Sequence, residues 1–163
     1  GGADEVGRQR MRVVVVGASG NVGTAVLRRL AAELPEDGFS TYGGQSDFLV
    51  GGLAAGSAGT IAGFANVFPR TIVRIYDLYN EGKFKEAMEL HKKAALAEQP
   101  CKAGIAAVKY AASLNTARAA GIENAGEKLR PRKPYLEPSE ADKEKIRSGI
   151  AEVATIEASL TSA

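Results

Sequence analysis

The stretch Gly38–Pro69, "GFSTYGGQSDFLVGGLAAGSAGTIAGFANVFP", alternates short apolar segments with glycine-rich turns. We expect four elements in it and just after it, a strand, a helix, a second strand and a second helix, over residues 39–44, 46–56, 57–67 and 70–80. Ser46 or Asp47 lies near the predicted cap of the first helix, and Pro69 suits the first turn of the second. The stretch therefore predicts a βαβα unit.

A further strand and helix precede this unit in "VVVVGASGNVGTAVLRRL", Val13–Leu30. Residues 11–17 form a continuous β-branched run without alternation, which is typical of a parallel strand covered on both faces. A glycine turn follows, and residues 21–34 carry apolar side chains at helical spacing. The order β-α-β-α-β-α predicts an α/β fold with a small parallel sheet of about three strands and right-handed crossovers.

The second half of the chain is predicted to be helical. Helices are expected over 83–99 and 102–115, and "LRPRKPYLEP" at 129–138 is a proline-rich connector. Ser139 and Asp142 then stand at capping-box spacing at the start of a last helix. We expect one compact domain with four segments: a disordered leader, a Rossmann-like βα unit, a barrel-derived βαβα unit and C-terminal helices, over residues 1–10, 11–36, 37–82 and 83–163.

Composition excludes several classes of function. The net charge of +2 is too small to indicate nucleic acid or an anionic membrane as a partner. The chain has one cysteine, Cys101, and one histidine, His91. An internal disulfide is therefore excluded, and we expect no zinc site. No apolar run is long enough for a spanning helix, and the polar start has no signal core, so we expect a cytoplasmic protein.

The glycine turn is the first candidate binding site. Gly17, Gly20 and Gly23 have the spacing that lets backbone N–H groups approach a phosphate at a helix start. "MRVVVVGASGNVG" resembles the first strand and turn of the extended short-chain dehydrogenase/epimerase family, which implies NAD(P) or phosphate binding. The candidate cofactor-binding residues are Gly17, Ser19, Gly20, Asn21, Val22 and Gly23.

The rest of a nicotinamide site is missing from the sequence. No acidic residue ends the second strand, where the ribose of the cofactor would need a partner. Tyr79 and Lys83 have the spacing of that family's catalytic pair, but they flank a predicted break between helices, so we attribute the spacing to chance. We therefore expect no catalytic residue and no required cofactor.

A second resemblance covers residues 37–160. "GGQSDF", "GSAGTIAGFANVFP", "YNEGKFKEAMEL" and "LRPRKPYLEPSEADKEKI" resemble the last part of the dihydrodipicolinate synthase/N-acetylneuraminate lyase superfamily, in particular fungal 4-hydroxy-2-oxoglutarate aldolase-like members. The resemblance implies a (β/α)₈ barrel with a Schiff-base lysine and a substrate pocket lined by backbone around Gly43 and Gly44. It places that lysine at Val16, with Val15 or Gly17 as alternatives in register, and none of these is an amine. Lys83, Lys85 and Lys109 are predicted on outer helices.

Both resemblances share the string "GNVG", Gly20–Gly23, where they meet. Our leading hypothesis is an engineered chimera of Rossmann and barrel fragments that folds but does not catalyse. The alternatives are a phosphate- or NAD(P)-binding module and a pyruvate-dependent aldolase or lyase, which the absence of an amine at Val16 disfavours. A sheet face left open by so few elements predicts either cover by the C-terminal helices or a homodimer.

The remaining side chains that could do chemistry have plain structural interpretations. Tyr76 and Tyr79 share a helical face with Ile72 and Ile75, which indicates core packing. His91 is expected on a solvated face beside two lysines, and Cys101 as a small residue at a helix start. "RPRK", residues 130–133, is expected to be part of the connector.

Overall fold

Two short strands pair in parallel at one end of the protein. The computed structural model describes residues 40–160. In it β1 (Tyr42–Gly43) pairs with β2 (Gly59–Thr60), with Tyr42 opposite Gly59 and Gly43 opposite Thr60. The backbone ladder continues beyond both strands, since the Ala58 amide donates to the Thr41 carbonyl and the Ile61 amide to the Gly43 carbonyl, each at 2.8 Å. The first predicted strand, over 11–17, lies outside the described residues.

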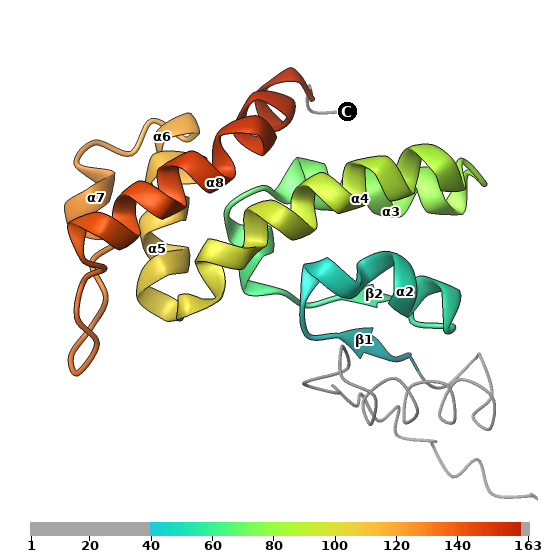
Figure 1. The fold of residues 1–163 in the computed structure, drawn as a ribbon, viewed down its shortest axis with the longest axis horizontal. Coiled ribbons are helices and arrows are strands. Elements are labelled where there is room, and N and C mark those ends of the chain that lie inside the picture. Colours follow the sequence, from blue (N-terminus) through green and yellow to red (C-terminus); the bar gives the residue numbers. More distant parts are fainter. Residues whose placement is uncertain (1–39, 161–163) are drawn as a thin grey trace, which may run out of the picture.

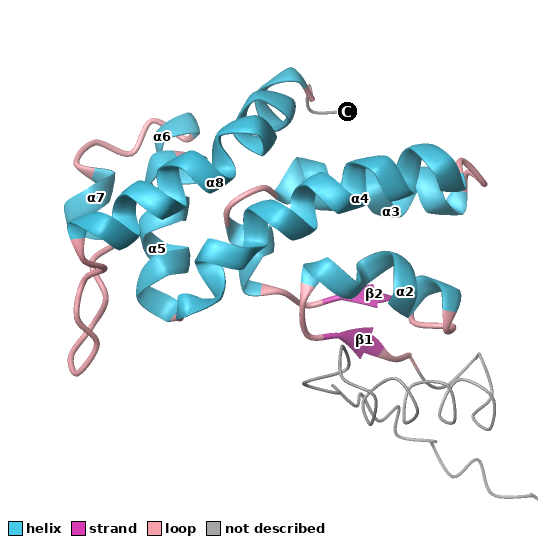
Figure 2. Ribbon diagram, viewed as in Figure 1, coloured by secondary structure: helices cyan, strands magenta, loops and turns pink. Residues whose placement is uncertain are grey.

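The chain between the strands forms η1 (Ser46–Phe48), a 3₁₀ turn, and α2 (Leu49–Ala54). Eight further helical elements follow β2 within the described residues. The first seven are η2 (Gly63–Asn66), α3 (Pro69–Asn80), α4 (Phe84–Glu98), η3 (Gln99–Ala103), α5 (Ile105–Leu114), α6 (Thr116–Ala119) and α7 (Ala125–Lys128). The last helix, α8 (Glu140–Ser159), runs back across α4 and α5 (Figure 1). Helices make up most of the described chain (Figure 2).

The buried core lies between helices rather than on the sheet. Phe64, Phe68 and Ile75 are almost completely buried, and they are joined by Ile146 and Val153 of α8. The rings of Phe64 and Phe68 meet edge to face with centroids 5.3 Å apart. α2 packs on both strands, and α3 and α4 pack on α2 in turn, so the helical layer stacks on α2 (Figure 1).

The prediction of a third strand over residues 57–67 is largely wrong. Only Gly59–Thr60 is extended and paired, and the chain then turns into η2. Within η2 the Phe64 side chain is 1% exposed, and a continued strand could not place it against Phe68. Burial of the Phe64 side chain is therefore the physical reason that the strand ends at Thr60 and the following residues turn into η2.

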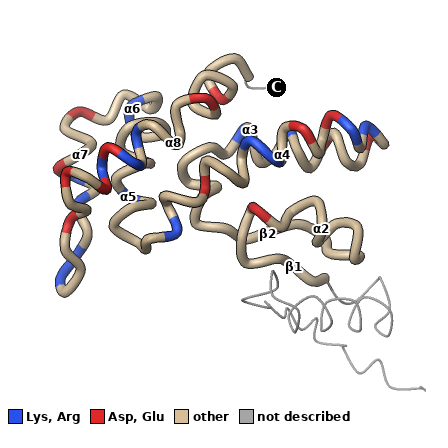
Figure 3. The backbone as a smooth tube through the Cα atoms, viewed as in Figure 1, with Lys and Arg blue, Asp and Glu red and all other residues tan. Residues whose placement is uncertain are grey.

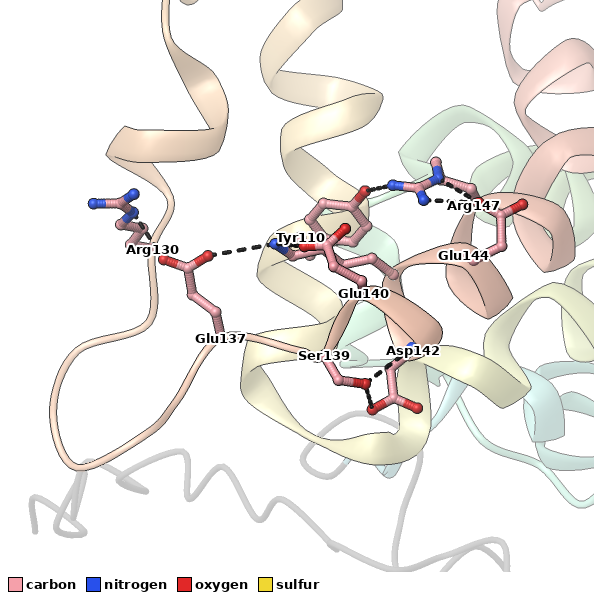
Figure 4. A network of polar contacts seen from close by, with 9 residues as sticks. Tyr110, Arg130, Glu137, Ser139, Glu140, Asp142, Glu144 and Arg147 are labelled. Carbon is pink, nitrogen blue, oxygen red and sulfur yellow. Dashed lines mark hydrogen bonds and ion pairs between the residues drawn. The ribbon is translucent and has the colours of Figure 1, made fainter.

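The helix starts marked by proline and serine are confirmed. Pro69 is the first residue of α3, where its missing N–H removes no hydrogen bond. Ser139 caps α8, because its hydroxyl accepts from the Asp142 amide at 3.2 Å and donates to the Asp142 carboxylate at 2.7 Å (Figure 4). Ser46, in contrast, caps no helix, and its hydroxyl is used elsewhere.

The proline-rich connector is held at its base by a polar network around the start of α8 (Figure 4). Glu137 pairs with Arg130 at 2.8 Å and with Lys143 at 3.6 Å. The Lys143 ammonium lies 5.7 Å from the ring centroid of Tyr110, whose hydroxyl accepts from Arg147 at 2.6 Å. Residues 130–133 thus lie in the connector, as predicted, and Arg130 is engaged within the chain.

Charged side chains are distributed unevenly along the fold. Between residues 40 and 68 the only charged residue is Asp47, whereas α4 and α8 carry many (Figure 3). No described helix is long and apolar enough to cross a membrane. The predicted leader, 1–10, and the first βα unit, 11–36, lie outside the described residues.

Candidate functional site

The two strands end at the same edge of the sheet because they are parallel, and this edge carries the candidate site. Gly44 and Gln45 follow β1, and the backbone after β2 leads to Gly63. The hydroxyl of Thr60, the last residue of β2, donates to the Gly43 carbonyl at 3.0 Å and to the Gln45 carbonyl at 3.1 Å, so it joins the end of β2 to the end of β1. In parallel α/β folds the carboxyl ends of the strands are where ligands bind.

A cleft of about 420 Å³ opens at this edge, between the strand ends and the segment η3–α5. This volume is within the range of small-molecule sites. The lining combines glycine-rich backbone, apolar side chains and three charged side chains. The charged residues are Glu98, Lys102 and Lys109.

Two polar contacts hold the segment after β1, residues 44–47, against the helices; we call this segment the strand-end loop. The Ser46 hydroxyl donates to the Glu98 carboxylate at 2.7 Å, across 52 residues of chain. Lys102 pairs with Asp47, the neighbour of Ser46 in η1. Because Ser46 is 1% exposed and Glu98 6% exposed, the first of these contacts is shielded from water. The helical layer therefore fixes the position of the loop that follows β1.

Burial changes the acid–base properties of three groups near this contact. Desolvation raises the pKa of Glu98, with the nearby Asp47 charge adding to it and the Ser46 hydrogen bond opposing it. Desolvation also raises the pKa of the Cys101 thiol to about 12, so this buried cysteine is a poor nucleophile. The pKa of His91 is lowered, again mainly by desolvation.

The structure places the two predicted substrate-pocket glycines differently. Gly44 lines the cleft, and its role in a substrate pocket stays a prediction. Gly43 is buried in β1, where its carbonyl accepts from the Ile61 amide and the Thr60 hydroxyl. The predicted cofactor-binding residues lie outside the described residues, and their role stays a prediction: Gly17, Ser19, Gly20, Asn21, Val22 and Gly23.

Two predictions about side-chain environment are wrong. His91 was expected on a solvated face but is 8% exposed, because that face of α4 packs against η1. Tyr76 was expected in the core but is 37% exposed, while Tyr79 is half-buried against Phe84 with ring centroids 5.1 Å apart. Cys101 is a buried small residue in η3, in keeping with its predicted structural role.

The surroundings of the individual lysines could not be predicted from their positions in the sequence. Lys83 pairs with Glu81 at 2.8 Å at the turn before α4. Lys109, predicted on an outer helix, instead lines the cleft together with Gly44. Glu98 and Lys102 were not predicted as site residues, because no local pattern indicates a contact across more than 50 residues.

No cluster of three or more potential metal ligands occurs within residues 40–160.

The sequence pattern of the dihydrodipicolinate synthetase family matches residues 10–153. The chain belongs to this family. It is 65% identical over 135 residues to a protein of Coccidioides immitis (strain RS) named as a mitochondrial 4-hydroxy-2-oxoglutarate aldolase, covering 83% of this chain and 43% of that protein. A similarly named mitochondrial protein of Emericella nidulans is 35% identical over 140 residues, covering 85% of this chain and 42% of its own length.

A solved structure from the same family has a similar fold. The crystal structure of a dihydrodipicolinate synthase family protein from Coccidioides immitis superposes with a TM-score of 0.85 at 59% identity, over 92% of this chain and 47% of that one. The chain thus spans about half the length of the relatives it matches.

These findings correct two expectations and leave a third without support. The family match begins at residue 10 and runs through "GNVG" without a break, so the engineered Rossmann–barrel chimera is wrong. The expectation of a scaffold without catalysis is also overturned, because the relatives are named as aldolases. Those names place the relatives in mitochondria, so they give no support to the expected cytoplasmic location.

Proposed function

We propose that this chain is part of an aldolase that cleaves a carbon–carbon bond in a 2-oxo acid of the 4-hydroxy-2-oxoglutarate type. The observation that carries the proposal is the 65% identity over 135 residues to a protein named for that activity. The family resemblance seen in the sequence implies the same chemistry, namely Schiff-base formation between an amine and a 2-oxo acid.

The described part of the chain supports this function through its strand ends. The cleft combines backbone at Gly44 and Gln45 with charged and apolar side chains, which suits a small polar substrate. Residues 40–68 carry almost no charge, in keeping with a segment that is enclosed within a barrel. The Ser46–Glu98 contact keeps the strand-end loop in one position.

The proposed reaction is a retro-aldol cleavage. An amine condenses with the C2 ketone and releases water, and the hydroxyl at C4 then loses its proton. The C3–C4 bond breaks, its electron pair moves toward the iminium, and an aldehyde leaves. Hydrolysis of the remaining enamine releases pyruvate and regenerates the amine. Val16 offers no amine for this step.

The test is reductive trapping together with product detection. The chain is incubated with pyruvate and borohydride, and the intact mass and the modified peptide are determined by mass spectrometry. In parallel, pyruvate release from 4-hydroxy-2-oxoglutarate is followed with a coupled dehydrogenase. We expect one lysine adduct and substrate-dependent pyruvate release. The absence of both overturns the proposal for this chain.

Three other expectations stand beside this proposal. We propose that a second copy of the chain is a partner, which light scattering with size exclusion tests.

Binding of NAD(P) or phosphate at Gly17–Gly23 is tested by titration of NADH fluorescence, and we expect neither to be required for cleavage. A cytoplasmic location is tested by fractionation against mitochondrial markers.

A further inference from the structure

The cleft at the strand ends contains one lysine whose charge is not used within the described part of the chain. We propose that Lys109 binds the carboxylate at the end of a dicarboxylic 2-oxo acid that is remote from the ketone. This inference deepens the proposed aldolase function and rests on it. It assigns to Lys109 a role in substrate specificity.

The charged groups of the cleft differ in their engagement. Glu98 accepts from Ser46, and Lys102 pairs with Asp47, so both of these side chains already have partners. Lys109, in contrast, has no hydrogen bond or ion pair with any described residue. Within residues 40–160 its charge is therefore available to an incoming anion.

The helix that carries Lys109 directs one face to the cleft. Ile105, Val108 and Lys109 all line the cleft, at the spacing of positions i, i+3 and i+4. Ile105 is 54% exposed and presents an apolar surface beside the cation. A short carbon chain that ends in a carboxylate matches this pair of apolar and cationic groups.

The backbone adds to the positive potential of this wall. Gly104 and Ile105, at the N-terminal end of the ten-residue helix α5, also line the cleft. The first turn of α5 carries no acidic residue, and no side chain caps it, so its partial positive charge is not neutralised locally. Lys109 and this helix end therefore favour an anion at the same wall.

Substrate chemistry supplies the other half of the match. 4-Hydroxy-2-oxoglutarate has a carboxylate at each end, and only one of them adjoins the ketone. The wall formed by α5 faces Gly44 and Gln45 across a cleft of about 420 Å³, which is ample for a five-carbon acid. Recognition of the second carboxylate would separate such substrates from pyruvate and from monocarboxylic 2-oxo acids.

The experiment compares two probes of equal carbon number. 2-Oxoglutarate carries the remote carboxylate and 2-oxopentanoate lacks it, and both are titrated by isothermal calorimetry at low salt. We expect the unaltered chain to bind 2-oxoglutarate more tightly. Lys109→Gln should weaken 2-oxoglutarate binding about tenfold and leave 2-oxopentanoate unchanged, as for the loss of a charge-assisted hydrogen bond. Lys109→Arg should restore most of the preference.

Lys85→Gln is the matched control, because Lys85 is exposed on α4 and does not line the cleft. Thermal melting of each variant shows that folding is retained. The proposal is overturned if the unaltered chain shows no preference for 2-oxoglutarate, or if Lys109→Gln keeps the preference. A pyruvate adduct without that preference would refute the role of Lys109 alone and leave the aldolase function standing.

Discussion

His91 is the single histidine of the chain, and its imidazole lies between α4 and the strand-end loop. Burial lowers its pKa from the ordinary value of 6.5, while a hydrogen bond to the Asp47 backbone and the Asp47 charge oppose that shift. Its Nδ1 atom has no hydrogen-bond partner in the described structure. The folded state therefore favours the neutral imidazole.

This preference predicts a pH dependence of stability. As the pH falls through 6.5, the unfolded chain binds a proton at His91 before the folded chain does, so the free energy of unfolding decreases. The raised pKa of Glu98 acts in the opposite direction, because its contribution is present below pH 4.5 and is lost as pH rises through its folded pKa. Urea unfolding from about pH 8 down to about pH 5.5 measures the net slope.

His91→Gln should flatten this slope, and it should also lower stability at neutral pH by about 1 kcal/mol through lost packing and hydrogen bonding. Glu89→Gln provides the control, since Glu89 is an exposed neighbour on α4 whose change should leave the slope near pH 6 intact. A His91→Gln variant that keeps the full slope would show that another group is responsible.

At the scale of single elements, the start of α3 depends on a residue far along the chain. The Glu157 carboxylate of α8 accepts from the Arg70 amide at 2.9 Å and from the Thr71 amide and hydroxyl at 2.7 Å each. These amides belong to the first turn of α3, which has no intrahelical acceptor for them. Glu157 therefore caps α3 and fastens α8 to it.

We expect Glu157→Ala to lower the free energy of unfolding by about 2 kcal/mol, because it leaves the buried Thr71 hydroxyl and two amides without an acceptor. Glu152→Ala, on the same helix, removes only an exposed ion pair with Lys93 and should cost less than about 0.5 kcal/mol. Urea unfolding of the two variants checks this difference. Equal losses would contradict a capping role for Glu157.

Local signals predicted the elements that have local causes. Pro69 and Ser139 mark helix starts that the structure confirms, since capping depends on residues within one turn. The Glu157 cap and the Ser46–Glu98 contact could not be predicted, because they join residues 86 and 52 positions apart. Gly44 was expected in the site only because the family resemblance implied it, and no local pattern indicated Glu98, Lys102 or Lys109.

At the scale of the whole molecule, α8 is the element that joins the helical layer together. It packs against α3, α4, η3 and α5, and it contributes Ile146, Ile150 and Val153 to the core (Figure 1). One glycine of α8, Gly149, lies close against η3. A Cβ built at Gly149 would lie 2.9 Å from Cγ of Pro100, which is closer than van der Waals contact allows.

Gly149 therefore sets the distance between α8 and η3. We expect glycine-to-alanine substitution to lower stability at Gly149 and to raise it at a helical glycine without such a contact. Alanine at a helical glycine ordinarily stabilises by about 0.5–1 kcal/mol. At Gly149 the contact with Pro100 should outweigh this gain and leave a net loss of about 1 kcal/mol, since overpacking costs about 1–3 kcal/mol.

Gly126 in α7 is the matched site, because a Cβ there would meet no atom within 4 Å. Gly126→Ala should raise the midpoint of urea unfolding, and Gly149→Ala should lower it, with no change in the slope of either transition. Because both exchanges add the same methyl group to a helix, helix propensity cannot account for opposite signs. If Gly149→Ala is as stabilising as Gly126→Ala, α8 can move away from η3 at no cost, and the close approach at Pro100 does not determine how the helical layer packs.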